Sequence, residues 1–174
     1  MDAIQNMLTR TSVKKYKPDP VAKGLLDQII EAGTHAPTGR NLQSPIILAV
    51  TNTQVRDELS KLNAKVLGAP EGTDPFYGAP VVLVVLANKA CNTRVYDGAL
   101  VMGNLQLAAH ALGLGACWIH RAKETFEMPE GKALLEKLGI EGEYEGIGNC
   151  IVGYPDGELP AIKPRKENWV YYVD

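Results

Sequence analysis

The sequence predicts one domain that contains both helices and strands. The chain has 174 residues, which is enough to bury a sizeable core, and 45% of them are apolar. Amphipathic stretches of helix length alternate with short apolar runs of strand length. No internal repeat, low-complexity tract or linker divides the chain, so we expect residues 1–174 to form a single domain.

Charge and composition exclude several classes of protein. The formal net charge is −2, so the broad basic surface of a nucleic-acid-binding protein is not expected. No apolar run reaches the ~20 residues of a membrane-spanning helix, and residues 1–10 lack the apolar centre of a secretory signal. Cys91, Cys117 and Cys150 lie far apart, which is typical of free buried thiols in a reducing compartment. We therefore expect a cytoplasmic protein without nucleic-acid or membrane partners.

Two helices are expected before the first strand. Residues 2–9 form an amphipathic run that Asp2 can cap. The second helix is expected to have Asp19 as its N-cap, Pro20 as its first helical residue and Gly33 as its stop.

The middle of the chain predicts two strands with a helix between them. Residues 46–51 and 81–87 are apolar runs of strand length. The second run is almost wholly apolar and rich in β-branched residues, so we expect a central strand that is buried on both faces. A helix is expected to start at Thr53, and residues 68–78, rich in Gly, Pro and acids, are expected to form a mobile loop.

The remaining core elements follow in the second half of the chain. Residues 96–114 have apolar residues on most sides, which predicts a buried central helix. Residues 116–119 and 147–154 are expected to be strands. Between them a helix is expected to begin at Pro129 and stop at Gly139. Its inward-facing residues are expected to be Leu134, Leu135 and Leu138.

The last residues are unusual for a chain end. Residues 169–173 are aromatic and β-branched, a composition with high strand propensity. Chain ends usually fray unless something holds them. We therefore expect this run to pair with an edge strand, either of its own subunit or of a partner.

Three segments carry polar and cationic side chains that could hold a ligand. Residues 10–17 combine four cations with hydroxyl groups, which suits an anionic group such as a phosphate. The alternative for this segment is a solvated basic turn. A second cationic segment is Lys163–Arg165.

The third segment is the loop before the first strand. Pro37 and Gly39 give it turn character, and it carries side-chain donors and acceptors. The alternative is an ordinary helix-to-strand connection. If the three segments converge, they describe a site for a phosphorylated ligand whose own chemistry does the work. The polar side chains of the loop are Thr38, Asn41 and Gln43.

The sequence carries no motif for catalysis by the protein's own groups. A Gly-x-Gly-x-x-Gly after a strand, a P-loop and a Gly-x-Ser-x-Gly elbow are all absent. His35, His110 and His120 lack ligand-like spacing, so no metal site is expected. His110 falls within the buried helix pattern and is expected to be structural. We name no catalytic residue.

Five motifs follow one another over nearly the whole chain. They are Arg10-Thr11-Ser12-Val13-Lys14-Lys15-Tyr16, Ala36-Pro37-Thr38-Gly39-Arg40-Asn41-Leu42-Gln43, the Asp97 helix ending in Gly113-Leu114-Gly115-Ala116-Cys117-Trp118-Ile119, Ile151-Val152-Gly153-Tyr154-Pro155, and Lys163-Pro164-Arg165. Each is weak alone, whereas the set is fairly specific. Taken together and in this order, the motifs resemble the FMN-dependent nitroreductase family.

The resemblance implies a fold and an assembly. The fold would be α+β, with a nitroreductase-like central mixed or antiparallel sheet flanked by helices. Two chains would form an intertwined homodimer, with the C-terminal strand exchanged and two FMN sites at the subunit interface.

The resemblance also implies which residues hold the cofactor. Lys14 would lie near the pyrimidine edge of the flavin, where a cation stabilises the negative charge that two-electron reduction leaves near N1 and O2. Trp118, Ile119, His120 and Arg121 would run beside the flavin ring, with Ile119 and His120 nearest. The FMN phosphate would be held by Arg10, Ser12, Lys163 and Arg165, with Thr11 in the same cofactor-binding segment. The residues from the other subunit would be Pro37, Thr38, Gly39 and Asn41.

The implied activity is a ping-pong oxidoreduction. NAD(P)H would deliver a hydride to flavin N5 and leave, and a nitroaromatic, quinone or flavin-type acceptor would then enter the same site. The protein would position and tune the ring, without a catalytic side chain or a metal.

Departures from the family pattern motivate an alternative function. Gln43 is followed by Ser44 rather than by Pro and an aromatic residue, and residues 71–74 do not match an asparagine and a lysine of longer members. His120 and Arg121 stand where a glycine or a carboxylate is common. The alternative is a flavin-binding or storage module with little or no turnover. A third hypothesis is a structural α/β domain with basic turns at its surface.

Overall fold

The apolar run at Val81 forms the centre of the fold. The computed structural model describes residues 2–174. Strand β2 (Val81–Asn88) is buried along residues 81–87, and alternate side chains enter two separate hydrophobic cores. The prediction of a central strand buried on both faces is therefore confirmed.

An antiparallel sheet of four strands is built around β2. The strand order is β1-β2-β4-β3, so β1 and β3 form the two edges. Every neighbouring pair runs antiparallel. The other strands are β1 (Pro45–Val50), β3 (Gly115–Ile119) and β4 (Tyr144–Gly153).

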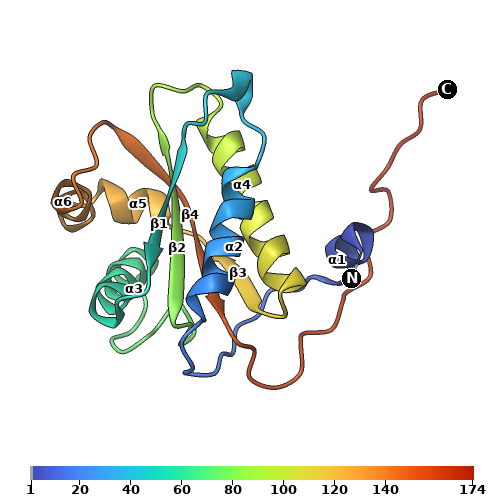
Figure 1. Cartoon of the computed structure of the whole chain (residues 1–174), viewed down its shortest axis with the longest axis horizontal. Coiled ribbons are helices and arrows are strands. Elements are labelled where there is room, and N and C mark those ends of the chain that lie inside the picture. Colours follow the sequence, from blue (N-terminus) through green and yellow to red (C-terminus); the bar gives the residue numbers. More distant parts are fainter. Residues whose placement is uncertain (1) are drawn as a thin grey trace.

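Helices cover both faces of this sheet, which confirms the α+β fold (Figure 1). On one face lie α2 (Lys23–Thr34) and α4 (Arg94–Ala111). On the other face lie α3 (Thr53–Leu67), α5 (Ala122–Glu127) and α6 (Pro129–Lys137). The short helix α1 (Ala3–Thr9) stands apart from the sheet, near the last turn of α4.

The predicted start of α2 is wrong. The helix begins at Lys23, with Ala22 rather than Asp19 as its N-cap and with no side-chain cap. The chain before it is held in an extended form, because the Lys17 N–H donates to the Tyr154 carbonyl. Gly33 lies inside the last turn of α2 rather than after it.

Two details of the later helices also differ from prediction. Helix α6 begins at Pro129 as predicted, but Leu138 is its C-cap and is 55% exposed rather than inward-facing. Helix α5 was not predicted. It follows Arg121, whose backbone is left-handed with φ 74°. Asn52 caps α3, which begins at Thr53 as predicted.

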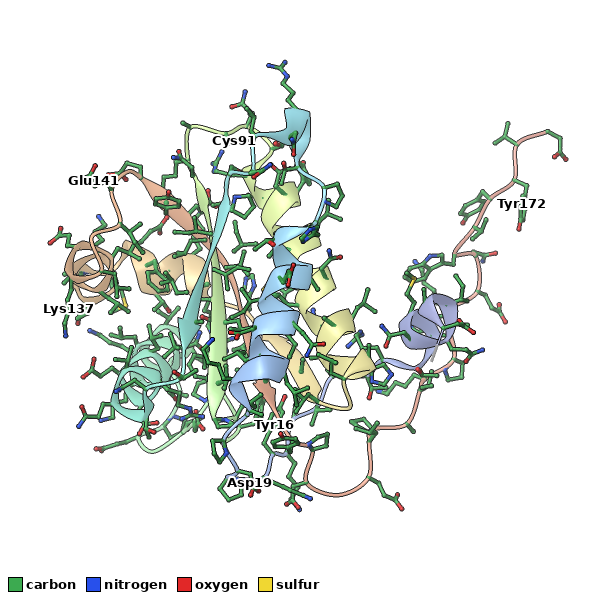
Figure 2. All side chains as sticks on the ribbon, viewed as in Figure 1. Tyr16, Asp19, Cys91, Lys137, Glu141 and Tyr172 are labelled. Atoms are coloured by element: carbon green, nitrogen blue, oxygen red, sulfur yellow. The ribbon has the colours of Figure 1, made fainter. Side chains whose placement is uncertain are left out.

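The tail after β4 takes no part in the sheet. Residues 160–174 form neither helix nor strand, and no strand within residues 2–174 pairs with them. The tail runs away from the body of the molecule, and Tyr172 near its end is 89% exposed (Figure 2). Pairing with an edge strand of its own subunit, one of the two predicted alternatives, is therefore absent.

The structure adds two findings to the exclusions made from composition. All three cysteines are free and buried. Within residues 2–174, no helix combines the length and the apolar character required to cross a membrane.

Candidate functional site

The first basic segment is fixed against the edge strand β3. Ser12 forms a parallel bridge with Ala116, and the Val13 N–H donates to the Ala116 carbonyl at 3.1 Å. The buried Tyr16 hydroxyl donates to the Val13 carbonyl at 2.7 Å. The backbone of this segment is therefore anchored at Ser12, Val13 and Tyr16, whereas the Lys14 and Lys15 side chains stay exposed.

Two polar atoms in this segment are buried without a partner. They are Arg10 Nη1 and Thr11 Oγ1, neither of which has a hydrogen-bond partner within residues 2–174. A buried donor that lacks a partner costs free energy, and a bound acceptor would recover it. Ser12 and Lys14 are exposed beside them. The four side chains thus offer N–H and O–H donors that suit an anionic group.

Two buried asparagines fix the end of β3. Asn63 of α3 donates to the His120 carbonyl at 2.9 Å and accepts from Arg121 Nε at 3.0 Å. Asn149 of β4 donates to the carbonyls of Ile119 and His120, both at 3.3 Å. The backbone at residues 119–121 is therefore held from both sides, while the His120 side chain stays exposed.

Trp118 lies on the same strand, one residue earlier. A glycine faces it, because a Cβ at Gly148 would lie 2.4 Å from Trp118 Nε1. The structure thus places residues 12 and 13 against Ala116 of β3, and residues 118–121 lie along and just past the end of the same strand.

The loop of residues 37–41 is built by a different set of contacts. The Gly39 N–H donates to Asp97 Oδ1 at 2.9 Å, and a Cβ at Gly39 would lie 2.5 Å from Thr93 Oγ1. Arg40 and Asn41 both have φ 53°, in the left-handed region. Thr38 Oγ1 accepts from the Gln43 N–H at 3.0 Å. The loop containing Pro37 is therefore held as a tight turn between α2 and β1.

This loop lies far from residues 10–14 of the same chain. Asp97, which holds the loop, is in the first turn of α4, whereas His110 in the last turn lies 2.9 Å from Thr9 Oγ1. At a rise of about 1.5 Å per residue, the two ends are about 20 Å apart. Figure 2 shows the same separation, since Tyr16 and Cys91 lie toward opposite ends of the molecule. One chain does not bring the two segments together.

Lys163 and Arg165 lie in the exposed tail. The Arg165 Nη2 donates to the Lys163 carbonyl at 3.1 Å, and both residues are exposed. The cationic pair is therefore available to a neighbouring molecule.

Comparison with known proteins identifies the family. The model of the nitroreductase family matches residues 7–154 of the chain. The chain belongs to the nitroreductase family. The resemblance inferred from the five motifs is thereby confirmed.

Relatives and solved structures agree with this assignment. The chain is 28% identical to a putative NADH dehydrogenase/NAD(P)H nitroreductase of Methanothermobacter thermautotrophicus, over 90% of this chain and 85% of the relative. It is 24% identical to an FMN reductase [NAD(P)H] of Bacillus subtilis, over 94% of this chain and 70% of the relative. A crystal structure of a nitroreductase with bound FMN from Bacteroides fragilis matches with a TM-score of 0.91 and 27% identity, over 100% of both chains.

Sequence reasoning missed several residues that hold the backbone around the candidate site. Asn63, Asn149 and Asp97 are buried polar groups that hold the backbone of the predicted site segments. Asp74 has the same role in the loop after α3. One signal was available: Asn149 is a lone polar residue inside an apolar strand, and buried polar groups are normally hydrogen-bonded.

Proposed function

We propose that this chain is an FMN-dependent NAD(P)H oxidoreductase. Membership of the nitroreductase family supports the proposal, as do the names of relatives that include an FMN reductase and an NADPH-flavin oxidoreductase. The observation that carries it is the pair of unpartnered buried atoms, Arg10 Nη1 and Thr11 Oγ1, at the edge of the sheet. An FMN phosphate supplies the acceptor oxygens that these donors lack.

Different residues of the chain bind different parts of FMN. Lys14 lies near the pyrimidine edge, where its charge stabilises the reduced ring. Bound FMN would take a hydride from NAD(P)H and pass two electrons to a nitroaromatic, quinone or flavin-type acceptor in the same open site. Because the chain contributes positioning and charge, no side chain acts as acid or base. Arg10, Thr11, Ser12, Lys163 and Arg165 hold the phosphate, and Trp118, Ile119, His120 and Arg121 lie beside the ring.

A second chain completes the site, in a homodimer. Pro37, Thr38, Gly39 and Asn41 sit about 20 Å from residues 10–14 of their own chain along α4, so a partner supplies them. Exposed apolar side chains support such an assembly: residues 4, 7 and 8 of α1 and residues 96 and 100 of α4 have large apolar side chains at least 47% exposed.

Within residues 2–174, one edge of the sheet is free to pair with an exchanged tail. Ser12 and Val13 already occupy the outer side of β3, whereas within residues 2–174 no strand pairs with the outer side of β1. The aromatic run 169–173 of the partner is therefore expected to pair with β1. This arrangement orders the tail and removes an exposed sheet edge.

Spectroscopy and titration of the purified protein test this function. The protein should be yellow and should release FMN on denaturation. Arg10→Ala and Arg165→Ala should each weaken FMN binding about 10- to 150-fold, because each loses a charge-assisted contact of about 1.5–3 kcal/mol. Lys23→Ala is the control, since Lys23 is exposed on α2 and, among residues 2–174, forms a salt bridge with Asp27 alone. Colourless protein that takes up no FMN on reconstitution would overturn the proposal.

Anaerobic mixing separates turnover from storage. The storage alternative is favoured by residues 71–74, which lack the asparagine and lysine of longer members. NADH or NADPH should bleach the flavin if the chain is an oxidoreductase. Flavin that neither nicotinamide bleaches would favour storage.

A further inference from the structure

The turn after α3 presents an aromatic side chain that the proposed function leaves unused. Tyr77 has φ 53°, a left-handed backbone conformation that a bulky residue rarely adopts. Its neighbour Phe76 is fully buried in the core, whereas Tyr77 is 43% exposed. The strain at Tyr77 must be held by the surrounding contacts, and it keeps the ring on the outside of the turn.

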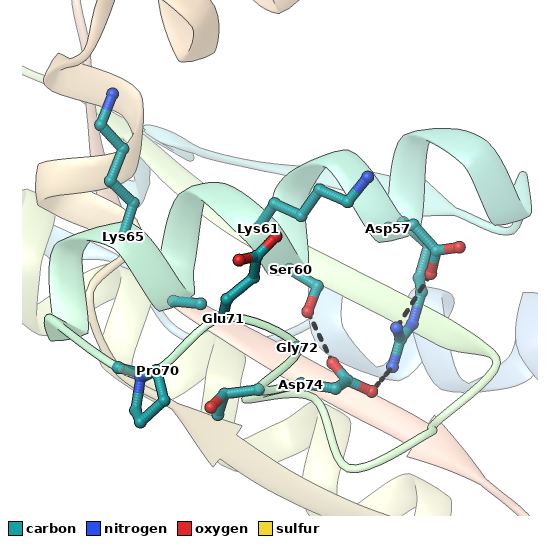
Figure 3. Close-up of a pocket in the computed structure, with 12 residues that line it drawn as sticks. Asp57, Ser60, Lys61, Lys65, Pro70, Glu71, Gly72 and Asp74 are labelled. Carbon is teal, nitrogen blue, oxygen red and sulfur yellow. Dashed lines mark hydrogen bonds and ion pairs between the residues drawn. The ribbon is translucent and has the colours of Figure 1, made fainter.

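Asp74 supplies those contacts. Its carboxylate accepts from Ser60 Oγ at 2.6 Å, from the Phe76 N–H at 3.0 Å and from the Gly78 N–H at 2.7 Å, and it forms an ion pair with Arg56. Figure 3 shows the Asp74 and Ser60 side chains pointing toward each other beneath α3. Burial alone would raise the pKa of Asp74, but these hydrogen bonds outweigh it and hold the pKa below its usual range. The turn is therefore fixed by an ionised carboxylate.

The ring that this turn holds lies beside Lys14. Lys14 Nζ is 5.5 Å from the centre of the Tyr77 ring, within the range of a cation–π contact. Within residues 2–174, Lys14 forms no salt bridge, in contrast to Lys15, whose Nζ is 2.8 Å from Asp156. An aromatic face attracts an ammonium group and leaves its positive charge uncompensated. A carboxylate partner would compensate that charge. Lys14 is thus held in place with its full charge free to act elsewhere.

We propose that Tyr77 is a positioning residue for Lys14, an inference that rests on the proposed flavin function. The ring restricts the Lys14 side chain so that its ammonium stays at the pyrimidine edge of the flavin. There the charge favours the reduced cofactor. Tyr77 therefore acts on the cofactor's potential through Lys14, and Asp74 acts by fixing Tyr77.

The flavin midpoint potential tests this role. Tyr77→Leu should lower the potential and slow reduction by NAD(P)H by about two- to five-fold, since it removes the cation–π contact. Tyr77→Phe is the matched control, because it keeps the ring, and it should behave like the wild type. Lys14→Met should lower the potential further. Adding Tyr77→Leu to Lys14→Met should then change nothing, because the charge that the ring positions is gone.

A second readout needs no cofactor. Reductive ¹³C-methylation of lysines keeps their charge. In the apoprotein, the methyl signal of Lys14, assigned with Lys14→Arg, should carry a ring-current shift. Tyr77→Leu should abolish that shift, and Tyr77→Phe should keep it.

The two readouts separate the inference from the function on which it rests. A protein that binds no FMN refutes the proposed function, while the methyl signal still tests the contact. A protein that binds FMN but keeps the wild-type potential in Tyr77→Leu overturns the inference alone. An unshifted Lys14 methyl signal in the apoprotein overturns it as well.

Discussion

The Asp97 carboxylate shows how one residue holds a whole loop. It is 3% exposed, and within residues 2–174 it forms no salt bridge. It accepts hydrogen bonds from the Gly39 N–H at 2.9 Å and Thr93 Oγ1 at 2.8 Å, and longer ones from Ser44 Oγ and Cys91 Sγ. Burial alone would raise the pKa of Asp97, but these hydrogen bonds outweigh it and lower the pKa. The loop of residues 37–41 is therefore built on a buried anion.

Asp97→Asn should destabilise the protein. The amide NH₂ would face donors where an oxygen now accepts, and a buried donor left without a partner costs about 1–3 kcal/mol. Urea denaturation should show a loss of this size in the free energy of unfolding. Asp27→Asn is the control, since its exposed pair with Lys23 should contribute at most about 0.5 kcal/mol. Equal losses in the two variants would contradict the role given to Asp97.

Comparison of the wild type with Asp97→Asn also gives the pH dependence of the Asp97 hydrogen bonds. Because the pKa of Asp97 is lower in the folded state, its contribution is complete above the ordinary aspartate pKa of about 4. It is lost as the pH falls from there through the lowered pKa. The stability difference between the wild type and Asp97→Asn should therefore shrink below about pH 4. A difference that stays constant under acid would argue against an ionised Asp97.

At the scale of elements, the packing of α2 on α4 depends on Gly33. A Cβ at this position would lie 2.6 Å from Leu105 Cδ2. Gly33→Ala should therefore push the helices apart and lower the free energy of unfolding by about 1–3 kcal/mol. Gly24→Ala is the control in the same helix. No heavy atom lies within 4 Å of a Cβ there, so alanine should raise stability by about 0.5–1 kcal/mol. Thermal unfolding should show that Gly33→Ala is less stable than the wild type and that Gly24→Ala is more stable.

The same glycine shows what sequence can predict. Strand β2 and helix α4 were predictable because their composition is decided by burial. Gly33 was interpreted as a helix stop, although it is a contact point with Leu105, seventy-two positions away. The false N-cap at Asp19 has a similar cause, since Lys17 is held by Tyr154. Local patterns predict elements, and distant contacts decide where they begin and end.

The residues of the candidate site also differ in whether local sequence indicates them. Residues 10–14 and 118–121 were named from local motifs, and the structure places Ser12 beside Ala116 on β3, the strand that ends at Ile119. Asp74 and Tyr77 were not, because their roles depend on Ser60 and Lys14, which are distant in sequence. Side-chain chemistry is visible in a motif, whereas the group that orients it usually is not.

At the scale of the whole molecule, the two halves of the proposed site lie at opposite ends of α4 in one chain. Residues 10–14 lie near its last turn, and residues 37–41 lie near its first. If each complete site takes one half from each chain, defects in different halves can compensate one another. One variant chain carries Arg10→Ala, and the other carries Thr38→Ala together with Asn41→Ala. In the homodimer of either variant, both sites are defective. A mixed dimer of the two has one site with every defect and one site with none.

Co-expression of the two chains with different tags should therefore restore binding. The purified mixed dimer should bind about one FMN with wild-type affinity, measured by quenching of flavin fluorescence during titration of the apoprotein. Each parent homodimer should bind FMN at least tenfold more weakly, since each loses contacts at both sites. If each site were instead built from a single chain, each site of the mixed dimer would carry the defect of its own chain. It would then bind no FMN tightly, and the shared site would be refuted even if the protein is a dimer.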